Sequence, residues 1–320
     1  MDKRRLGNSD LEFRPIALGG LVFGWTADET MSHRLLDAFV DAGGSLVETA
    51  ESYTFWAPQS AWGRSEEVIG NWLRRNPGKR DKVLIATKCT ELSRTRLRES
   101  VEASLARLNV DCIDLFQSHR DDTAVPLEET LSAYGELIRE GKIRCIGASN
   151  HDAERLAEAD RVARTNDLPR YQSLQPHYNL LERSLFEGAL EEQCLRLGLG
   201  VLPYYPLAAG FLTGKYRSEA DYDKSVRGAS QTVRKYMTPR GLAVLDALHA
   251  VAHKHGTSSA TVALAWLLHR RSVTAPIASA TTLGQLEALL AAPCLDLDAE
   301  SLAALDAASA APPQPPSLVG

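Results

Sequence analysis

The chain has 320 residues, with 36 Lys and Arg against 41 Asp and Glu, which gives a formal net charge of −5. This mixed, mildly acidic composition provides no basic surface for nucleic acid, and no uninterrupted run of about 18 apolar residues predicts a membrane-spanning helix. The five cysteines contain no C-x-x-C pair. Reduced thiols, a cytoplasmic location and no metal site are therefore expected.

Short apolar runs alternate with longer amphipathic stretches along the chain. Eight runs have the length of a buried strand, at 16–18, 46–48, 83–87, 112–117, 143–147, 171–174, 200–203 and 274–278. Eight stretches with helical periodicity lie between or after them, at 31–42, 65–75, 94–108, 126–140, 152–164, 183–197, 257–268 and 283–290. This alternation predicts a (β/α)8 TIM barrel that forms a single domain over residues 1–320. A doubly wound sheet is disfavoured, because no G-x-G-x-x-G follows the first strand.

Three segments fall outside the repeat. Residues 4–14 predict a β-hairpin that turns at Asn8-Ser9-Asp10 and plugs the bottom of the barrel. Residues 208–240 have no clear period and are expected to form a long loop. The tail, 311–320, contains four prolines and is expected to be irregular.

Polar residues follow several predicted strands, and the active site of a TIM barrel lies at the C-terminal ends of its strands. Glu48 ends the second strand, Tyr53 lies in the loop after it, Lys88 closes the third strand and His119 closes the fourth. Neighbouring strands are expected to bring these four side chains to one side of the barrel mouth.

Motifs that contain these residues resemble those of the aldo-keto reductases. The similarity extends from the first predicted strand to the last, in the family's order, through segments 41–53 with 63–70, 85–88, 114–119, 147–150, 204–207 with 214–216, and 276–279.

The resemblance implies reduction of an aldehyde or ketone to an alcohol with a nicotinamide cofactor. It assigns Tyr53 as the general acid, with Lys88 expected to lower the pKa of the phenol. Glu48 would hold Lys88 by an ion pair, and His119 would orient the substrate carbonyl. The family has Asp at the position of Glu48, so the carboxylate is expected to be displaced by about 1 Å. Catalysis is sensitive to displacements of this size.

The resemblance also implies a cofactor site. Its expected members are Gly20, Ser149, Asn150, Gln175, Tyr204, Leu207, Ala208, Lys215, Arg227, Ser279, Thr281 and Gln285. Among these, Ser149, Asn150 and Gln175 suit the donors and acceptors of a carboxamide, and Tyr204 would stack on the nicotinamide ring. Leu207, Ala208 and Lys215 would clamp the pyrophosphate, with Arg227 assisting.

The helix that begins near residue 283 would bind the 2′-phosphate of NADP at its N-terminus, with Ser279 and Thr281 near the phosphate and Gln285 near the adenine. Thr281 stands where many NADP-preferring relatives have Arg. NADP is still expected, with a reduced preference over NAD, because hydroxyl groups bind phosphate more weakly than a guanidinium does.

Aromatic residues in the loops after the first two strands, Trp25, Phe55 and Trp56, predict an apolar wall for a small carbonyl substrate. An alternative function is a cofactor-binding, redox-sensing or regulatory module with little turnover, which would tolerate Glu48. Reduction of a carbon–carbon double bond is disfavoured by His119, since relatives with that activity carry Glu there.

Overall fold

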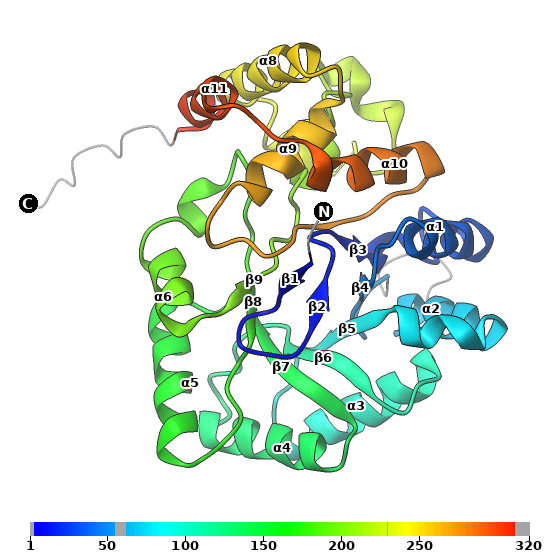
Figure 1. Ribbon diagram of the computed structural model, residues 1–320, viewed down its shortest axis with the longest axis vertical. Helices are drawn as coiled ribbons and strands as arrows, with labels where there is room; N and C mark the ends of the chain where they lie inside the picture. Colours follow the sequence, from blue (N-terminus) through cyan, green and yellow to red (C-terminus); the bar gives the residue numbers. More distant parts are fainter. Residues whose placement is uncertain (1–2, 55–61, 229, 311–320) are drawn as a thin grey trace, which may run out of the picture.

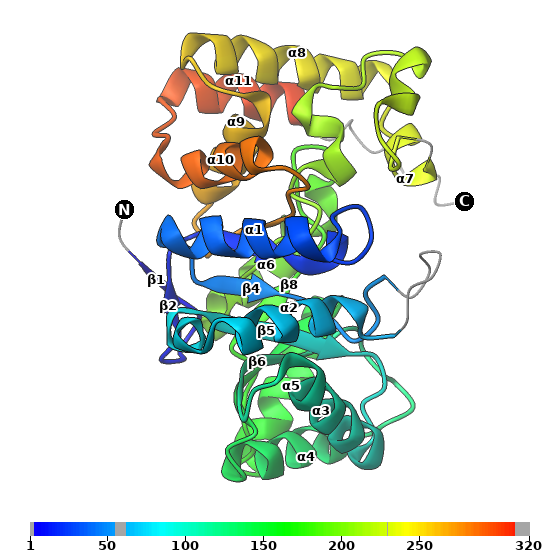
Figure 2. The ribbon, with the colours of Figure 1, turned by 90° about the vertical axis from the view of Figure 1, so that its right-hand side faces the viewer.

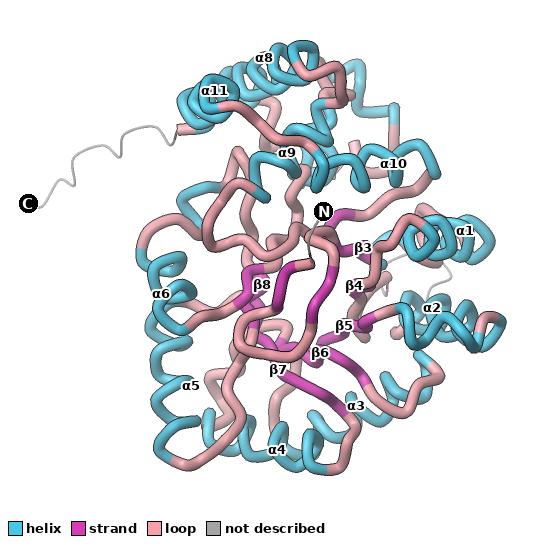
Figure 3. Tube along the Cα trace, viewed as in Figure 1, coloured by secondary structure: helices cyan, strands magenta, loops and turns pink. Residues whose placement is uncertain are grey.

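The computed structural model describes residues 3–54, 62–228 and 230–310. Eight parallel strands form the predicted (β/α)8 barrel (Figures 1 and 3), in the order β10-β3-β4-β5-β6-β7-β8-β9. They are β3 (Ala17–Gly19), β4 (Leu46–Glu48), β5 (Leu84–Cys89), β6 (Ile113–Ser118), β7 (Ile143–Ser149), β8 (Ser173–Gln175), β9 (Gly200–Val201) and β10 (Ile277–Ala278). Each strand overlaps a predicted apolar run, so the fold prediction is confirmed.

The barrel closes between β9 and the segment that leads into β10. The amide of Thr274 donates to the carbonyl of Val201 at 2.8 Å, and the amide of Ile277 donates to the carbonyl of Pro203 at 2.9 Å. Both strands are shorter than predicted. Pro203 and Pro276 lie beside them, and proline has no amide hydrogen with which to extend a ladder.

Helices cover the outside of the barrel. Those that overlap predicted stretches are α1 (Glu29–Asp41), α2 (Arg64–Arg75), α3 (Arg94–Leu108), α4 (Leu127–Arg139), α5 (Ala153–Thr165), α6 (Ala189–Leu197), α9 (Ser259–Leu268) and α10 (Leu283–Ala291). The predicted helix over 183–197 is divided in two. A 3-10 turn, η3 (Arg183–Leu185), precedes Gly188, whose φ of 95° interrupts the helix before α6 begins.

Other helical segments lie outside the predicted stretches. Two are long, α8 (Pro239–Lys254) and α11 (Ala299–Ser309), and the rest are short: α7 (Gln231–Arg234), η1 (Gly20–Val22), η2 (Pro77–Lys82), η4 (Ala208–Thr213), η5 (Glu219–Lys224) and η6 (Ala292–Cys294). The segment expected as a long loop, 208–240, therefore holds several turns too short to show a period. The predicted tail, 311–320, lies outside the described residues.

The N-terminal hairpin consists of β1 (Arg4–Arg5) paired antiparallel with β2 (Glu12–Phe13). The guanidinium of Arg4 donates to the carbonyls of Val273 at 2.9 Å and Leu268 at 3.1 Å. Apolar residues of the hairpin pack with the barrel interior in one buried cluster that includes Leu6, Leu11, Phe13, Leu46, Ala86 and Leu115. The hairpin closes the N-terminal end of the barrel as predicted, opposite the end where α7 lies (Figure 2).

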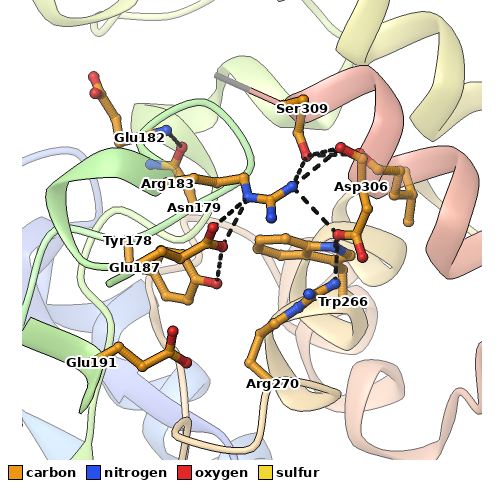
Figure 4. Close-up of polar contacts among 12 residues, drawn as sticks. Tyr178, Asn179, Glu182, Arg183, Glu187, Glu191, Trp266, Arg270, Asp306 and Ser309 are labelled. Carbon is orange, nitrogen blue, oxygen red and sulfur yellow. Dashed lines mark hydrogen bonds and ion pairs between the residues drawn. The ribbon is translucent and has the colours of Figure 1, made fainter. Parts of the chain in front are cut away.

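A polar network joins α11 to the rest of the fold (Figure 4). The buried ring of Trp266 lies 4.2 Å from the Arg270 guanidinium, and the Trp266 indole donates to Asp306 at 2.9 Å. Asp306 also accepts from Arg270 at 2.7 Å, and Arg183 donates to the Asp306 carbonyl at 3.1 Å. Asp306 of α11 thus accepts hydrogen bonds from both the buried indole of Trp266 and the guanidinium of Arg270, which follows α9.

Asp306→Ala is expected to lower the free energy of unfolding by about 1–3 kcal/mol, because it leaves the buried indole N–H of Trp266 without its acceptor. Denaturant unfolding followed by far-UV circular dichroism measures the change. Asp296→Ala is the matched control, since Asp296 is fully exposed and its one ion pair among the described residues is with His269, at 3.3 Å. Equal losses in the two variants would contradict this structural role for Asp306.

Within the described part of the chain, none of the helices has the length and apolar character needed to span a bilayer.

Candidate active site

The four residues predicted to carry the chemistry meet at the C-terminal end of the barrel. Glu48 is the last residue of β4, and Lys88 lies near the end of β5. His119 directly follows β6, and Tyr53 lies in the turn after β4, where its amide donates to the carbonyl of Ala50 at 3.2 Å. Because β4, β5 and β6 are adjacent and parallel, their ends bring these side chains to one place.

Tyr53, Lys88 and Glu48 form a hydrogen-bonded triangle, in which Lys88 and Glu48 are buried and Tyr53 is partly buried. The Lys88 ammonium donates to the Tyr53 hydroxyl at 2.8 Å and to the Thr49 carbonyl at 2.9 Å, and it is also ion-paired with Glu48. The Tyr53 hydroxyl in turn donates to Glu48 Oε1 at 2.9 Å. Gln175 Nε2 donates to the same oxygen at 3.2 Å. Glu48 therefore contacts the phenol directly, in addition to holding the lysine.

The pKa of Tyr53 differs from the sequence-based expectation. Burial raises the pKa of this phenol well above its usual value, and the charge of Glu48 and the hydrogen bond to it raise the pKa further. Burial also lowers the pKa of Lys88, against the opposing effect of Glu48. The expectation that Lys88 makes the phenol acidic is wrong for this structure, because a carboxylate accepts the phenolic hydrogen.

His119 lies beside the phenol. Its ring is edge-on to that of Tyr53, with 6.3 Å between ring centroids, and its Nδ1 is 3.4 Å from the hydroxyl of Ser52. Burial, together with the charges of Lys88 and Arg120, lowers the pKa of His119 to about 3. The imidazole is therefore neutral at physiological pH and can hydrogen-bond a carbonyl oxygen. Ser52 was missed by sequence reasoning, because a lone serine in a turn carries no signal.

Residues expected to bind the nicotinamide gather next to this triangle. The Ser149 hydroxyl donates to the Gln175 carbonyl at 2.9 Å. Asn150 has a left-handed φ of 54°, and its amide donates to the His119 carbonyl at 2.8 Å. The Tyr204 hydroxyl donates to Asn150 Oδ1 at 2.8 Å, which completes a connected group.

The ring of Tyr204 is stacked on one face by His177, with 5.1 Å between centroids and 20° between planes. Sequence reasoning gave His177 no role. Its contact with Tyr204 follows from the parallel bridge between residues 177 and 204, which the sequence alone does not reveal.

The segment expected to clamp a pyrophosphate is strained. Ala208 and Ala209, which follow Leu207, have φ angles of 48° and 56°, in the left-handed region that non-glycine residues rarely adopt. Such strain is concentrated at ligand-binding segments. Lys215 reaches this turn, because a Cβ added at Gly210 would lie 3.4 Å from its ammonium.

Gly20 is constrained by packing inside the protein. A Cβ at this position would lie 2.8 Å from the Ser65 hydroxyl and 3.0 Å from the Glu48 carbonyl. The Ser65 hydroxyl donates to the Gly20 carbonyl at 2.8 Å. The glycine therefore lets the turn after β3 approach β4 and α2, and its contact with a cofactor stays a prediction.

Arg227 offers a cation to an anionic ligand. Its Nη2 is buried and has no hydrogen-bond partner among the described residues, and its guanidinium lies 5.3 Å from the Trp25 ring. Burial lowers the pKa of Arg227, and Tyr205, Tyr216 and Tyr53 are the titratable groups that act on it. A buried guanidinium nitrogen without a partner fits a phosphate of the expected cofactor.

The N-terminus of α10 is arranged as a helix cap. Thr282 caps the helix, and the amide and hydroxyl of Thr281 donate to Gln285 Oε1 at 2.9 and 3.1 Å. Ser279 precedes this turn, and its hydroxyl would lie 3.0 Å from a Cβ at Gly19. No Lys or Arg occurs in residues 279–290.

Of the predicted substrate wall, Trp25 lies beside Arg227, and Phe55 and Trp56 lie outside the described residues. Two further buried polar residues lie on strands next to the site: Gln117 of β6, which pairs with Lys88 in the strand register, and Ser173 of β8. The hydroxyl of Ser173 and both amide atoms of Gln117 have no hydrogen-bond partner among the described residues. A Cβ at Gly147 would lie 2.3 Å from the Ser173 hydroxyl, so that glycine leaves room for it.

A model of the aldo/keto reductase family matches residues 15–310 of this chain. The chain belongs to the aldo/keto reductase family. It is 32% identical to aldo-keto reductase AMT2 of Alternaria alternata, with 97% of this chain and 92% of that protein covered. Protein tas of Escherichia coli (strain K12) is also 32% identical, over 96% of this chain and 97% of its own length. Aldo-keto reductase YhdN of Bacillus subtilis (strain 168) is 34% identical, over 85% of this chain and 81% of its own length.

As an aldo/keto reductase, this protein is an oxidoreductase that acts on small carbonyl compounds. The barrel mouth that holds Tyr53, Lys88, Glu48 and His119 is the place where its fold positions an active site.

Proposed function

We propose that this aldo/keto reductase reduces an aldehyde or ketone to an alcohol with NADPH, and that Tyr53 donates the proton. The observation that carries the proposal is the Tyr53 hydroxyl, which lies at the barrel mouth 2.8 Å from the Lys88 ammonium and beside a neutral His119. A positioned proton donor next to a fixed cation is the arrangement that protonation of a carbonyl oxygen requires.

NADPH, when bound, supplies the hydride. Ser149, Asn150 and Gln175 would hold its carboxamide, and Tyr204 would stack on its ring. The fit is supported by the connected hydrogen bonds of this group and by the unpartnered nitrogen of Arg227, which would take a phosphate together with Lys215.

The protein's own residues carry the proton chemistry. Neutral His119 would donate a hydrogen bond to the carbonyl oxygen and orient it toward Tyr53. The Tyr53 hydroxyl would give its proton to that oxygen, and the Lys88 ammonium would stabilise the negative charge that develops on the phenol oxygen during the transfer. Burial of Lys88 strengthens its interaction with Tyr53, since the local dielectric constant is low.

A panel of simple aldehydes and ketones with NADPH tests the function, with consumption of the cofactor followed by its absorbance. We expect turnover on several compounds. The alternative, a redox-sensing or regulatory module, is favoured by one observation: the Tyr53 proton is held by Glu48. Tight NADPH binding measured by fluorescence, without turnover of any compound, would support that alternative and overturn the proposed activity.

Thr281→Arg is expected to increase the preference for NADPH over NADH by about tenfold, because a guanidinium binds phosphate bidentately where a hydroxyl cannot. The ratio of the two dissociation constants, measured by fluorescence titration, checks this. Glu287→Arg is the matched control, since it adds an arginine to the same helix beyond its first turn. If wild-type protein prefers NADH, or if both variants act alike, the helix end does not hold a 2′-phosphate.

A further inference from the structure

The contact between Glu48 and Tyr53 has a chemical consequence of its own. Three donors converge on Glu48 Oε1: the Tyr53 hydroxyl at 2.9 Å, Gln175 Nε2 at 3.2 Å and the Lys88 ammonium. A lysine that only needed a counter-ion would not require this carboxylate to reach the phenol. The side chain of Glu48, one methylene longer than Asp, brings one oxygen into contact with both the Lys88 ammonium and the reacting hydroxyl.

A phenol has a single hydrogen to donate. In this structure that hydrogen is directed to Glu48. A substrate carbonyl must therefore compete with the carboxylate for it. In the reverse direction, an alcohol is bound and Tyr53 receives its hydroxyl proton. The same geometry then lets Glu48 accept the proton that Tyr53 already carries.

We propose that Glu48 is a proton-relay residue, which takes the proton of Tyr53 while Tyr53 takes the hydroxyl proton of an alcohol substrate. The inference rests on the proposed function. In this step the O–H bond of the alcohol breaks and a new Tyr53 O–H bond forms, while the old Tyr53 O–H bond breaks and a Glu48 O–H bond forms. The hydride from the alcohol carbon passes to the oxidised nicotinamide, which accepts both electrons.

After the product leaves, the proton returns from Glu48 through Tyr53, which is partly exposed, to water. Carbonyl reduction by this route is the reverse sequence, in which protonated Glu48 replaces the proton that Tyr53 gives to the substrate.

The other charged and titratable groups near Tyr53 do not offer this route. Lys88 donates to the phenol and cannot accept from it while protonated. His119 meets the Tyr53 ring edge-on and forms its polar contact with Ser52. Tyr204 and Tyr205 raise the pKa of Tyr53, as does burial, so a free phenolate is scarce. Tyr53 acts on the pKa of Arg227 through charge, and the described residues show no hydrogen bond between the two side chains.

The proposal fixes the pH dependence of both directions. Oxidation of an alcohol releases one proton overall, so the pH slopes of log kcat/KM for oxidation and reduction differ by one at saturating cofactor. With the relay, oxidation of the alcohol needs no free phenolate, so kcat/KM for oxidation is nearly independent of pH around neutrality. The value of kcat/KM for carbonyl reduction then falls about tenfold for each unit by which the pH rises.

Glu48→Asp tests the relay, because it withdraws the carboxylate by about 1 Å, the reach of one methylene group, and restores the residue that the family has. Lys88 keeps a carboxylate partner, and the direct bond to Tyr53 is lost. We expect the two pH slopes of log kcat/KM to exchange. The kcat/KM for oxidation now rises about tenfold for each pH unit below the pKa of Tyr53, and kcat/KM for reduction becomes nearly independent of pH.

A second readout uses the cofactor-free protein. Tyrosine labelled with carbon-13 at the hydroxyl-bearing ring carbon reports ionisation by NMR, and the signal of Tyr53 is the one absent from Tyr53→Phe. In Glu48→Asp the pKa of Tyr53 is expected to fall by about one unit, a tenfold change in its ionisation constant. Should Glu48→Asp not fold, Glu48→Gln provides the same test, since an amide of equal length cannot take up a proton.

Glu66→Asp is the matched control. Glu66 is a second buried carboxylate near Lys88, but it bonds Thr87 at 2.6 Å and Arg107 at 2.7 Å and has no contact with Tyr53. The same change of length there should leave the slopes and the Tyr53 signal unchanged. The relay is overturned if Glu48→Asp and Glu66→Asp behave alike. Substantial turnover by Tyr53→Phe would instead overturn the proposed function.

Discussion

Replacing Tyr53 with Phe is expected to lower kcat for carbonyl reduction by about 10²–10⁴-fold, the usual contribution of a general acid. Phenylalanine keeps the ring that meets His119 edge-on and loses only the hydroxyl that bonds Lys88 and Glu48. Binding of NADPH should change little, because the residues proposed to hold the cofactor are untouched. Steady-state kinetics and a fluorescence titration of the cofactor measure the two effects separately.

Tyr205→Phe is the matched control for this variant. Tyr205 lies in the same aromatic group, with its ring centroid 5.4 Å from that of Tyr204, but no donor or acceptor of the triangle contacts it among the described residues. We expect its kcat to stay within about threefold of wild type. If Tyr53→Phe retains more than about a tenth of wild-type kcat, another group donates the proton.

Lys88→Met is expected to have the second large effect, a loss of about 3–5 kcal/mol of stability together with loss of catalysis. Lys88 and Glu48 are 1% and 2% exposed, so removal of the ammonium leaves a buried carboxylate without its cation. Denaturant unfolding measures the loss, and the same samples assayed with NADPH measure the activity.

The double variant Lys88→Met with Glu48→Gln separates the two consequences. Neutralising both partners removes the uncompensated charge, so part of the stability should return, while catalysis should not. A double variant no more stable than Lys88→Met would show that the cost comes from lost packing around the lysine stem, and not from the unpaired carboxylate.

Much of the fold could be predicted because its physical causes are local. Strands buried on both faces must be short apolar runs, and all eight were recognisable, as at residues 84–89 and 113–118. The helix α11 (Ala299–Ser309) was missed because it is rich in alanine, which marks no distinct apolar face. This helix is held by hydrogen bonds from Trp266 and Arg270 to Asp306, and these contacts join residues that are distant in sequence.

The candidate site divides in the same way. Glu48, Lys88 and His119 were found because a strand end fixes where each side chain must lie. The bond from Tyr53 to Glu48 could not be foreseen, since it depends on the course of a turn and on side-chain rotamers. For the same reason sequence reasoning predicted an acidic phenol, whereas the carboxylate and burial act in the opposite direction.

The hairpin at the bottom of the barrel has a consequence for the order of folding. Arg4 contacts Val273, 269 residues further along the chain, so this contact can form only after the strands and helices between the two residues have been synthesised. Contacts of such long sequence separation form slowly. Closure of the barrel is thus a late event: β3 can pair with β4 early, but its other edge stays unpaired until β10 has been made.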